Sequence, residues 1–148
     1  MTLVAYTREV SPTLADCELT HLEREPLDVA RAAAEHHAYE DLLSQLGATV
    51  RRLPAAPALP DAVFVEDTAV VLDEIAVITR PGAVSRRPET PSVASALAPH
   101  RPLAQIEGPA TLDGGDVLVV GRRLYVGLST RSSRTAIEQL ATLLRPFD

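Results

Sequence analysis

Cysteine and tryptophan are nearly missing from this chain. Its 148 residues include one cysteine, Cys17, no tryptophan and one methionine, and only 3% of them are aromatic. A single cysteine excludes a disulfide within the chain, so we expect Cys17 to be a thiol in a reducing cytoplasm. The sequence has no apolar run near the roughly 18 residues of a membrane span, and no leader is readable at its start. We therefore expect no association with a membrane.

Basic residues are also outnumbered. The chain has 14 residues of the lysine and arginine type and 20 aspartates and glutamates, which gives a formal net charge of -6 and a pI near 5.2. Binding to a nucleic-acid backbone requires a basic face, so this class of partner is excluded, whereas a small cationic substrate fits. With 46% apolar residues, the chain predicts a single domain over residues 1–148 with a buried core.

Helical spacing is clearest between Pro26 and Gly47. Pro26 suits a first helical turn, and Gly47 suits the stop. The side chains at this spacing form a stripe of Val29, Ala32, Tyr39, Leu43 and Leu46. The pattern predicts a helix over 26–47, followed by a strand over 48–53.

A pattern of two strands, a helix and a return strand follows. Strands are expected over 68–72 and 75–79, a helix over 88–97 opened by Pro88, and a strand over 103–106. The strand pair recurs over 116–120 and 124–128, followed by a helix over 132–144, and the offset from Thr68 to Asp116 is 48 residues. Such a unit cannot bury its own sheet face and must stack on neighbours.

Three motifs carry residues suited to binding a guanidinium group. They read FVED over 64–67, ITRPGAVSRR over 78–87, and TLDGGDVLVV over 111–120. A guanidinium ion is planar and matches carboxylate oxygens two at a time, so Glu66, Asp67 and Asp113 suit a cationic head. Arg86 and Arg131 suit an anionic tail. Taken singly, the acidic pair also fits a solvated strand end, and Arg86 with its neighbour also fits surface charge.

Together these motifs resemble those of the dimethylarginine dimethylaminohydrolase family, within the guanidine-modifying amidinotransferase superfamily. The resemblance implies an α/β fold, a pentein-like propeller of five units around a central pocket. A 48-residue repeat allows this chain only the N-terminal three units, so the ring is not closed by this chain alone. The open edge would invite self-association or a complementing chain.

The resemblance also implies roles for individual residues. The positions matching Asp67 and Asp113 grip the guanidinium group, with Glu66 in the same pocket, and Asp113 adds electrostatic stabilisation in catalysis. The remaining substrate-binding assignments concern the amino-acid end and the alkyl part of the substrate: Arg86 and Arg131 for the α-carboxylate, Asp61 and the backbone carbonyl of Leu19 for the α-amino group, and Phe64 for packing. The chain has Arg131-Ser132-Ser133 where the family often has Arg-Thr-Asn, which puts helix capping in doubt, although serine can also cap.

The implied reaction needs a nucleophilic cysteine and a histidine, and neither occurs after Arg134. Cys17 lies in a segment that resembles the family's lid, and adjacent His36 and His37 on one helix point too far apart to chelate one metal. Cys17 with His21 is a weak zinc signal, so no metal and no cofactor are expected. Hydrolysis of methylated arginine is expected only of the complete protein, with this chain inactive alone. The alternative is a non-catalytic guanidine-binding or amino-acid-binding module that functions by association.

Overall fold

A computed structural model describes residues 3–19 and 22–147 of the chain. It divides into two compact units, Met1–Val65 and Glu66–Asp148, and each is described here by itself. The single domain expected over 1–148 stays a prediction. No helix in the described part of the chain has the length and apolar character to cross a membrane.

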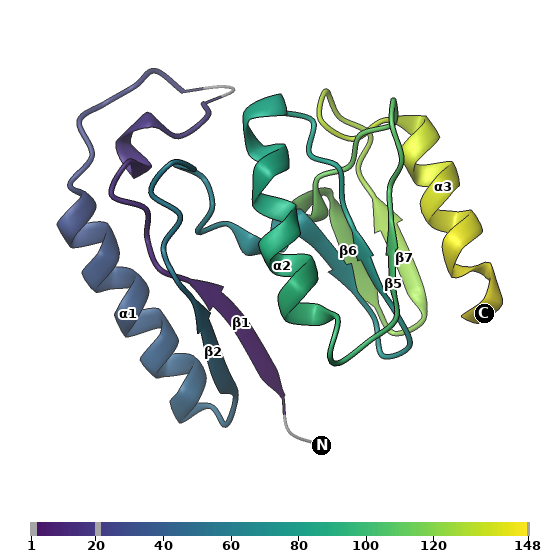
Figure 1. Ribbon diagram of the computed structural model, residues 1–148, viewed down its shortest axis with the longest axis horizontal. Helices are drawn as coiled ribbons and strands as arrows, with labels where there is room; N and C mark the ends of the chain where they lie inside the picture. The colour runs from purple at the N-terminus through teal and green to yellow at the C-terminus, as the bar shows by residue number, and fades with distance from the viewer. Residues whose placement is uncertain (1–2, 20–21, 148) are drawn as a thin grey trace. The chain divides into compact units, whose positions relative to one another are not determined.

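Unit 1 contains two parallel strands and one long helix (Figure 1). Strand β1 (Val4–Arg8) pairs with β2 (Thr49–Leu53), and helix α1 (Val29–Gln45) connects them. Asp28 caps α1, since its side chain accepts a hydrogen bond from the Arg31 amide at 2.9 Å. Gly47, with a φ of 93°, follows the helix in the left-handed region that favours glycine. The helix and strand predicted from the sequence are both confirmed.

The apolar stripe predicted for α1 is wrong at two of its positions. Tyr39 is 53% exposed and Leu46 is 77% exposed. The inner face instead buries Glu40, which is 2% exposed and accepts a hydrogen bond from the Thr7 hydroxyl at 2.5 Å. Burial acts to raise the pKa of Glu40, but hydrogen bonds from Arg52 and Thr7 outweigh it and lower that pKa. Spacing alone could not reveal this, because Thr7 and Arg52, which donate hydrogen bonds to Glu40, lie on β1 and β2.

Unit 2 is built around a three-stranded mixed sheet. Strands β3 (Ala69–Val71) and β4 (Ala76–Ile78) form an antiparallel hairpin, and β5 (Leu103–Gln105) runs parallel to β4. Helix α2 (Thr90–Leu97) makes the crossover between β4 and β5. All three residues of the central strand β4 are buried, because α2 contacts β3 and β4 while Val77 belongs to the main core cluster. These elements confirm the sequence prediction.

The start of α2 differs from the prediction. Residues Val84–Glu89 form a 3-10 helix that contains Pro88, and α2 begins at Thr90 with Pro91 in its first turn. Proline is tolerated in a first turn because its missing N–H has no helical partner there. Both Pro88 and Pro91 satisfy this rule, so the sequence did not decide at which of them the helix starts.

A second hairpin and helix complete unit 2. Strands β6 (Val117–Val120) and β7 (Arg123–Val126) pair antiparallel, and Gly121 in their turn has a φ of 60°. Helix α3 (Arg134–Leu144) follows, and α2 and α3 flank the strands of this unit (Figure 1). The main core joins residues of β3, β4 and α3 with the segment after β5: Val70, Val77, Ile106, Ala110, Leu112, Ala136 and Leu140. Val117, Leu124 and Val126 of the β6–β7 hairpin pack against this core, which therefore joins both hairpins in one unit.

Candidate functional site

The acidic residues of the motifs lie where the two hairpins of unit 2 begin. Glu66 and Asp67 belong to a 3-10 turn (Val65–Thr68) directly before β3. Asp113 precedes the 3-10 turn Gly114–Asp116, which leads into β6. The two turns contact each other, since the Gly115 amide donates a hydrogen bond to Asp67 Oδ1 at 3.0 Å. Residues 48 positions apart are thus joined at one end of both hairpins.

The two glycines of the second turn permit this contact. A Cβ atom on Gly114 would lie 2.0 Å from the Glu66 carbonyl oxygen, far inside van der Waals contact. A Cβ atom on Gly115 would lie 2.5 Å from Asp67 Oδ1 and 3.9 Å from Glu66 Oε1. The backbones of the two turns therefore approach closely at these glycines, and the Glu66 and Asp67 side chains both lie near Gly115.

Arg86 is buried between two carboxylates. It is 3% exposed, and its Nη1 donates to Asp67 Oδ2 at 2.6 Å. Its Nε and Nη2 donate to the two oxygens of Glu89 at 3.0 and 2.9 Å. Burial acts to lower the pKa of Arg86, but hydrogen bonds to Glu89 and Asp67 outweigh this effect and raise it. Arg86 is therefore a permanent cation held in a fixed orientation.

Glu89 is a site residue that the sequence interpretation missed. It is 2% exposed, although charged residues are almost never fully buried unless they are paired. The available signal was its spacing of three residues from Arg86, which places the two side chains on one face of a helical turn.

Asp113 is more deeply buried, with 1% exposure. Its Oδ1 accepts a hydrogen bond from the Gly82 amide at 2.9 Å, and its Oδ2 lies 3.3 Å from Arg131 Nε. Burial raises the pKa of Asp113, the negative charge of Asp67 raises it further, and the Gly82 amide, Arg131 and Arg86 oppose the shift. The carboxyl group is thus costly to ionise and would gain from a bound cation.

The backbone of Arg131 lies against Gly82, the residue whose amide donates to Asp113. A Cβ atom on Gly82 would lie 2.6 Å from the Arg131 Cα atom, so the two loops are in contact. The Arg131 side chain remains 45% exposed. Ser133 caps α3 by accepting a hydrogen bond from the Ala136 amide at 3.2 Å, so serine does perform the cap here.

The charges of this cluster are unbalanced. The carboxylates of Glu66, Asp67, Glu89 and Asp113 outnumber the guanidinium groups of Arg86 and Arg131. The excess negative charge favours a cation, and carboxylate oxygens suit the planar donors of a guanidinium group. Unit 2 therefore brings together Glu66, Asp67, Arg86, Asp113 and Arg131 from the predicted set.

The other three predicted residues lie in unit 1. Asp61 is 6% exposed, and its two carboxylate oxygens accept the Glu18 amide at 3.2 and 3.1 Å. The Phe64 amide donates to the Asp61 carbonyl at 3.0 Å, and the Phe64 side chain is 48% exposed. Leu19, which follows Glu18, is 40% exposed. Asp61 thus anchors the segment that leads to Leu19.

No metal-binding cluster is found among the described residues. No three histidine, cysteine, aspartate or glutamate side chains in 3–19 and 22–147 are arranged to hold a metal ion. Cys17 is a free, partly buried thiol. His36 Nε2 lies 3.4 Å from Glu40 Oε1, whereas His21 is outside the described residues.

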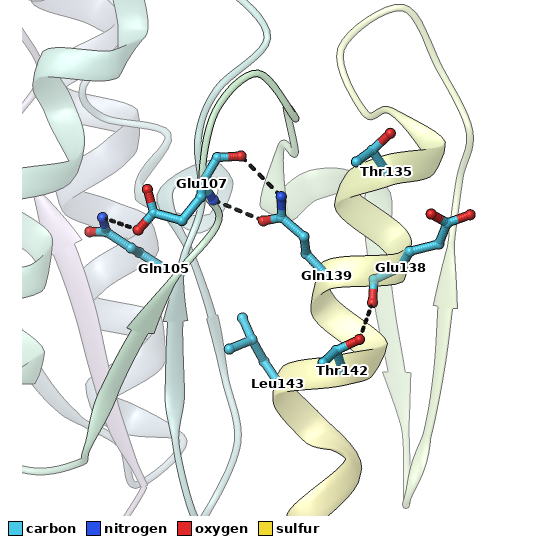
Figure 2. Close-up of a pocket in the computed structure, with 7 residues that line it drawn as sticks. All are labelled: Gln105, Glu107, Thr135, Glu138, Gln139, Thr142 and Leu143. Carbon is cyan, nitrogen blue, oxygen red and sulfur yellow. Dashed lines mark hydrogen bonds between the residues drawn. The ribbon is translucent and has the colours of Figure 1, made fainter.

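A pocket of about 460 Å³ is lined by residues of α3 and of β5 with the residues after it (Figure 2). Its lining consists of Gln105, Glu107, Thr135, Glu138, Gln139, Thr142 and Leu143. Gln139 bridges its two sides: the side-chain oxygen accepts the Glu107 amide at 2.9 Å, and the side-chain nitrogen donates to the Glu107 carbonyl at 3.1 Å. None of the predicted site residues lines this pocket.

The profile of the arginine deiminase family matches residues 54–146, which include every residue of the unit 2 cluster. The chain belongs to the arginine deiminase family. Within it, the resemblance to dimethylarginine dimethylaminohydrolases is also confirmed. The chain is 41% identical to the N(G),N(G)-dimethylarginine dimethylaminohydrolase of Streptomyces coelicolor over 144 residues, covering 97% of this chain and 56% of the relative.

A second relative and a solved structure support the resemblance to dimethylarginine dimethylaminohydrolases. The Pseudomonas aeruginosa dimethylarginine dimethylaminohydrolase is 36% identical over 119 residues, covering 79% of this chain and 47% of the relative. A solved structure of a cysteine-to-serine mutant of the Pseudomonas aeruginosa enzyme, complexed with citrulline, superimposes with a TM-score of 0.93 at 33% identity, over 99% of this chain and 58% of that one. The chain thus spans about half the length of the curated relatives it matches.

Proposed function

We propose that this chain carries the guanidinium-binding part of a dimethylarginine dimethylaminohydrolase. The proposed substrates are N-omega-methylated L-arginines, dimethylarginine and monomethylarginine, and the products are L-citrulline and the methylamine. The observation that carries the proposal is the joining of Asp67 and Asp113 in one negatively charged cluster, built on Gly114 and Gly115. The names of the relatives and the citrulline complex of a similar protein support it.

Each residue of the cluster has a proposed role. Asp67 and Asp113 hold the flat guanidinium head, with Glu66 in the same pocket, and Asp113 also stabilises positive charge there. Arg131 and Arg86 are assigned to the α-carboxylate by resemblance. Arg131 is the accessible one, because Arg86 is buried and its guanidinium nitrogens donate to Asp67 and Glu89.

The residues of unit 1 are assigned to the amino-acid end of the substrate by resemblance alone. Asp61 and the Leu19 carbonyl are proposed to contact the α-amino group, and Phe64 to pack on the alkyl and guanidinium parts. The anchoring of Glu18 by Asp61 supports a fixed position for the neighbouring Leu19 carbonyl.

The proposed chemistry requires groups that none of these residues supplies. A cysteine thiolate attacks the guanidinium carbon, and the methylamine leaves with a proton passed by a histidine. Water then cleaves the covalent thiouronium intermediate, which forms citrulline and releases the thiolate. We infer that this chain supplies three units of a five-unit propeller, and that the thiolate and the histidine come from the other two units. We further infer that this chain alone is inactive and that the protein acts in the cytoplasm.

Titration with dimethylarginine tests the proposed site. Asp67→Asn keeps the shape of the side chain but removes a charge that faces the cation, so we expect binding to weaken about tenfold or more. Calorimetry on the folded chain gives the affinity. Asp73→Asn is the matched control, since the Asp73 side chain is 77% exposed and lies in the β3–β4 turn. Equal affinities of Asp67→Asn and the unaltered chain would remove Asp67 from the site.

A guanidine-binding module that functions by association is the second candidate. The observation that favours it is the apolar outer face of the β6–β7 hairpin, where Leu118 and Tyr125 are 60% and 54% exposed. Adding, as a separate chain, the part of a relative that this chain does not cover distinguishes the two functions. Citrulline formation would support the hydrolase, whereas tight association without turnover would support the module.

A further inference from the structure

Glu89 has no role in the proposed binding contacts, yet it is one of the most buried charged residues of unit 2. Both of its oxygens accept hydrogen bonds from Arg86, from Nε at 3.0 Å and from Nη2 at 2.9 Å. This two-point contact fixes the plane of the guanidinium group more firmly than a single hydrogen bond would. Glu89 therefore determines which way the remaining Nη1 group of Arg86 points.

Nη1 is the group that reaches the binding site. It donates to Asp67 Oδ2 at 2.6 Å, while Asp67 Oδ1 accepts the Gly115 amide at 3.0 Å. Both oxygens of the Asp67 carboxylate thus accept a hydrogen bond, and the hydrogen bond at Oδ2 depends on Arg86. Rotation of Arg86 would release Asp67 at Oδ2.

Charge gives Glu89 a second effect on the site. Arg86 beside Asp67 alone would form a neutral pair, which has little attraction for a cation. Glu89 offsets the charge of Arg86, so the group of three keeps a net negative charge. The negative charge of Asp67 then remains effective toward a ligand.

We propose that Glu89 is a positioning residue, which acts through Arg86 to orient the Asp67 carboxylate and to preserve its attraction for a flat cation. This inference rests on the proposed guanidinium site. It assigns to the Arg86-Arg87-Pro88-Glu89 segment a role in ligand affinity, in addition to its role in the fold.

The Gly115 amide reports the orientation of Asp67 without any ligand. In Glu89→Gln, NMR should show faster hydrogen exchange and a shifted resonance for the Gly115 amide, together with faster exchange of the Arg86 Nε proton. The Arg31 amide, which donates to Asp28 Oδ1 at 2.9 Å, is the control resonance and should not change. If Glu89→Gln does not fold, Glu89→Asp keeps the charge but shortens the reach, and a smaller change of the same kind is expected.

Glu35→Gln is the matched control variant. Glu35 also pairs with an arginine on a helix, Arg31 at 2.8 Å, but both side chains are largely exposed. It should leave the Gly115 amide and the Arg86 Nε proton as they are in the unaltered chain. If the folded Glu89 variants also leave both signals unchanged, Glu89 does not position Asp67 and the inference is overturned.

A double-mutant cycle with dimethylarginine separates positioning from a purely structural role. Glu89→Gln should weaken binding about tenfold in the unaltered background. It should add little to Asp67→Asn, because its effect passes through Asp67. An equal loss in both backgrounds would overturn the inference. Failure of the unaltered chain to bind would instead contradict the proposed function, and the ligand-free signals would still decide the role of Glu89.

Discussion

Burial of the Asp113 carboxyl group couples its ionisation to folding. Burial and the charge of Asp67 raise its pKa above the ordinary value of 3.8. The folded state therefore holds this proton more tightly than the unfolded state. The contribution of Asp113 to the free energy of unfolding is largest at pH below 3.8 and falls as pH rises through the higher folded pKa. A cation bound beside Asp113 would lower its pKa and offset this loss.

A pH dependence of ligand binding follows at this residue. We expect the affinity for dimethylarginine to rise as pH increases through the raised pKa of Asp113, because only the ionised form attracts the cation. In Asp113→Asn, this part of the pH dependence should disappear, since an amide does not ionise there. Calorimetric titrations over a pH series measure both profiles. A variant whose affinity follows the same pH profile as the unaltered chain would contradict this role for Asp113.

At the scale of elements, the contact between the two 3-10 turns should tolerate almost no added volume. We expect Gly114→Ala to cost about 2 to 4 kcal/mol in the free energy of unfolding, because its Cβ atom would overlap the Glu66 carbonyl and force the turns apart. Chemical denaturation measures the change.

Gly127→Ala is the control for this substitution. The nearest heavy atom to its Cβ would be the Asp116 carbonyl oxygen at 3.7 Å, an ordinary contact, so we expect a change within about 0.5 kcal/mol. Similar losses in the two variants would show that the backbone freedom of glycine matters here and the close approach does not.

The elements themselves were largely predictable from local patterns. Apolar runs, turn residues and the 48-residue offset identified both hairpins of unit 2. Burial on α1 was not predictable, because Glu40 is buried through contacts with Thr7 on β1 and Arg52 on β2, which only the folded arrangement brings against the helix.

The candidate site was predictable to the extent that its residues lie in motifs. The motifs named Asp67 and Arg86 but not the hydrogen bond between them, which depends on how the segment before β3 meets the 3-10 helix after β4. Glu89 was missed because a glutamate near a helix start is usually solvated, and only tertiary packing reveals its burial.

At the scale of the whole molecule, the β6–β7 hairpin presents an apolar outer face. Leu118, Val120 and Tyr125 are 60%, 55% and 54% exposed, and Leu118 lies opposite Tyr125 in the strand register. Alternate residues of the same strands, Val117 and Val126, pack against the core. Exposed apolar side chains grouped on one sheet face are typical of a surface that another protein segment covers.

A charge on this face should reduce association. We expect the unaltered chain to associate as its concentration rises, and Leu118→Asp to weaken that association about tenfold or more, since it places a charge in an apolar contact. Sedimentation velocity over a concentration series measures this. Leu22→Asp is the control, because Leu22 is 78% exposed but lies outside the hairpin. A purely monomeric unaltered chain, or an equal effect of both variants, would contradict the assignment of this face.

The side chain of Gln139 has a consequence for the sheet of unit 2. Its amide meets both the N–H and the carbonyl of Glu107, the two groups that a further strand would use beyond β5 (Figure 2). An unprotected sheet edge can template the addition of strands from other molecules, which leads to aggregation. Because the Gln139 side chain already pairs with the N–H and the carbonyl of Glu107, these two groups cannot bind an added strand. This edge is therefore a poorer template for fibril growth.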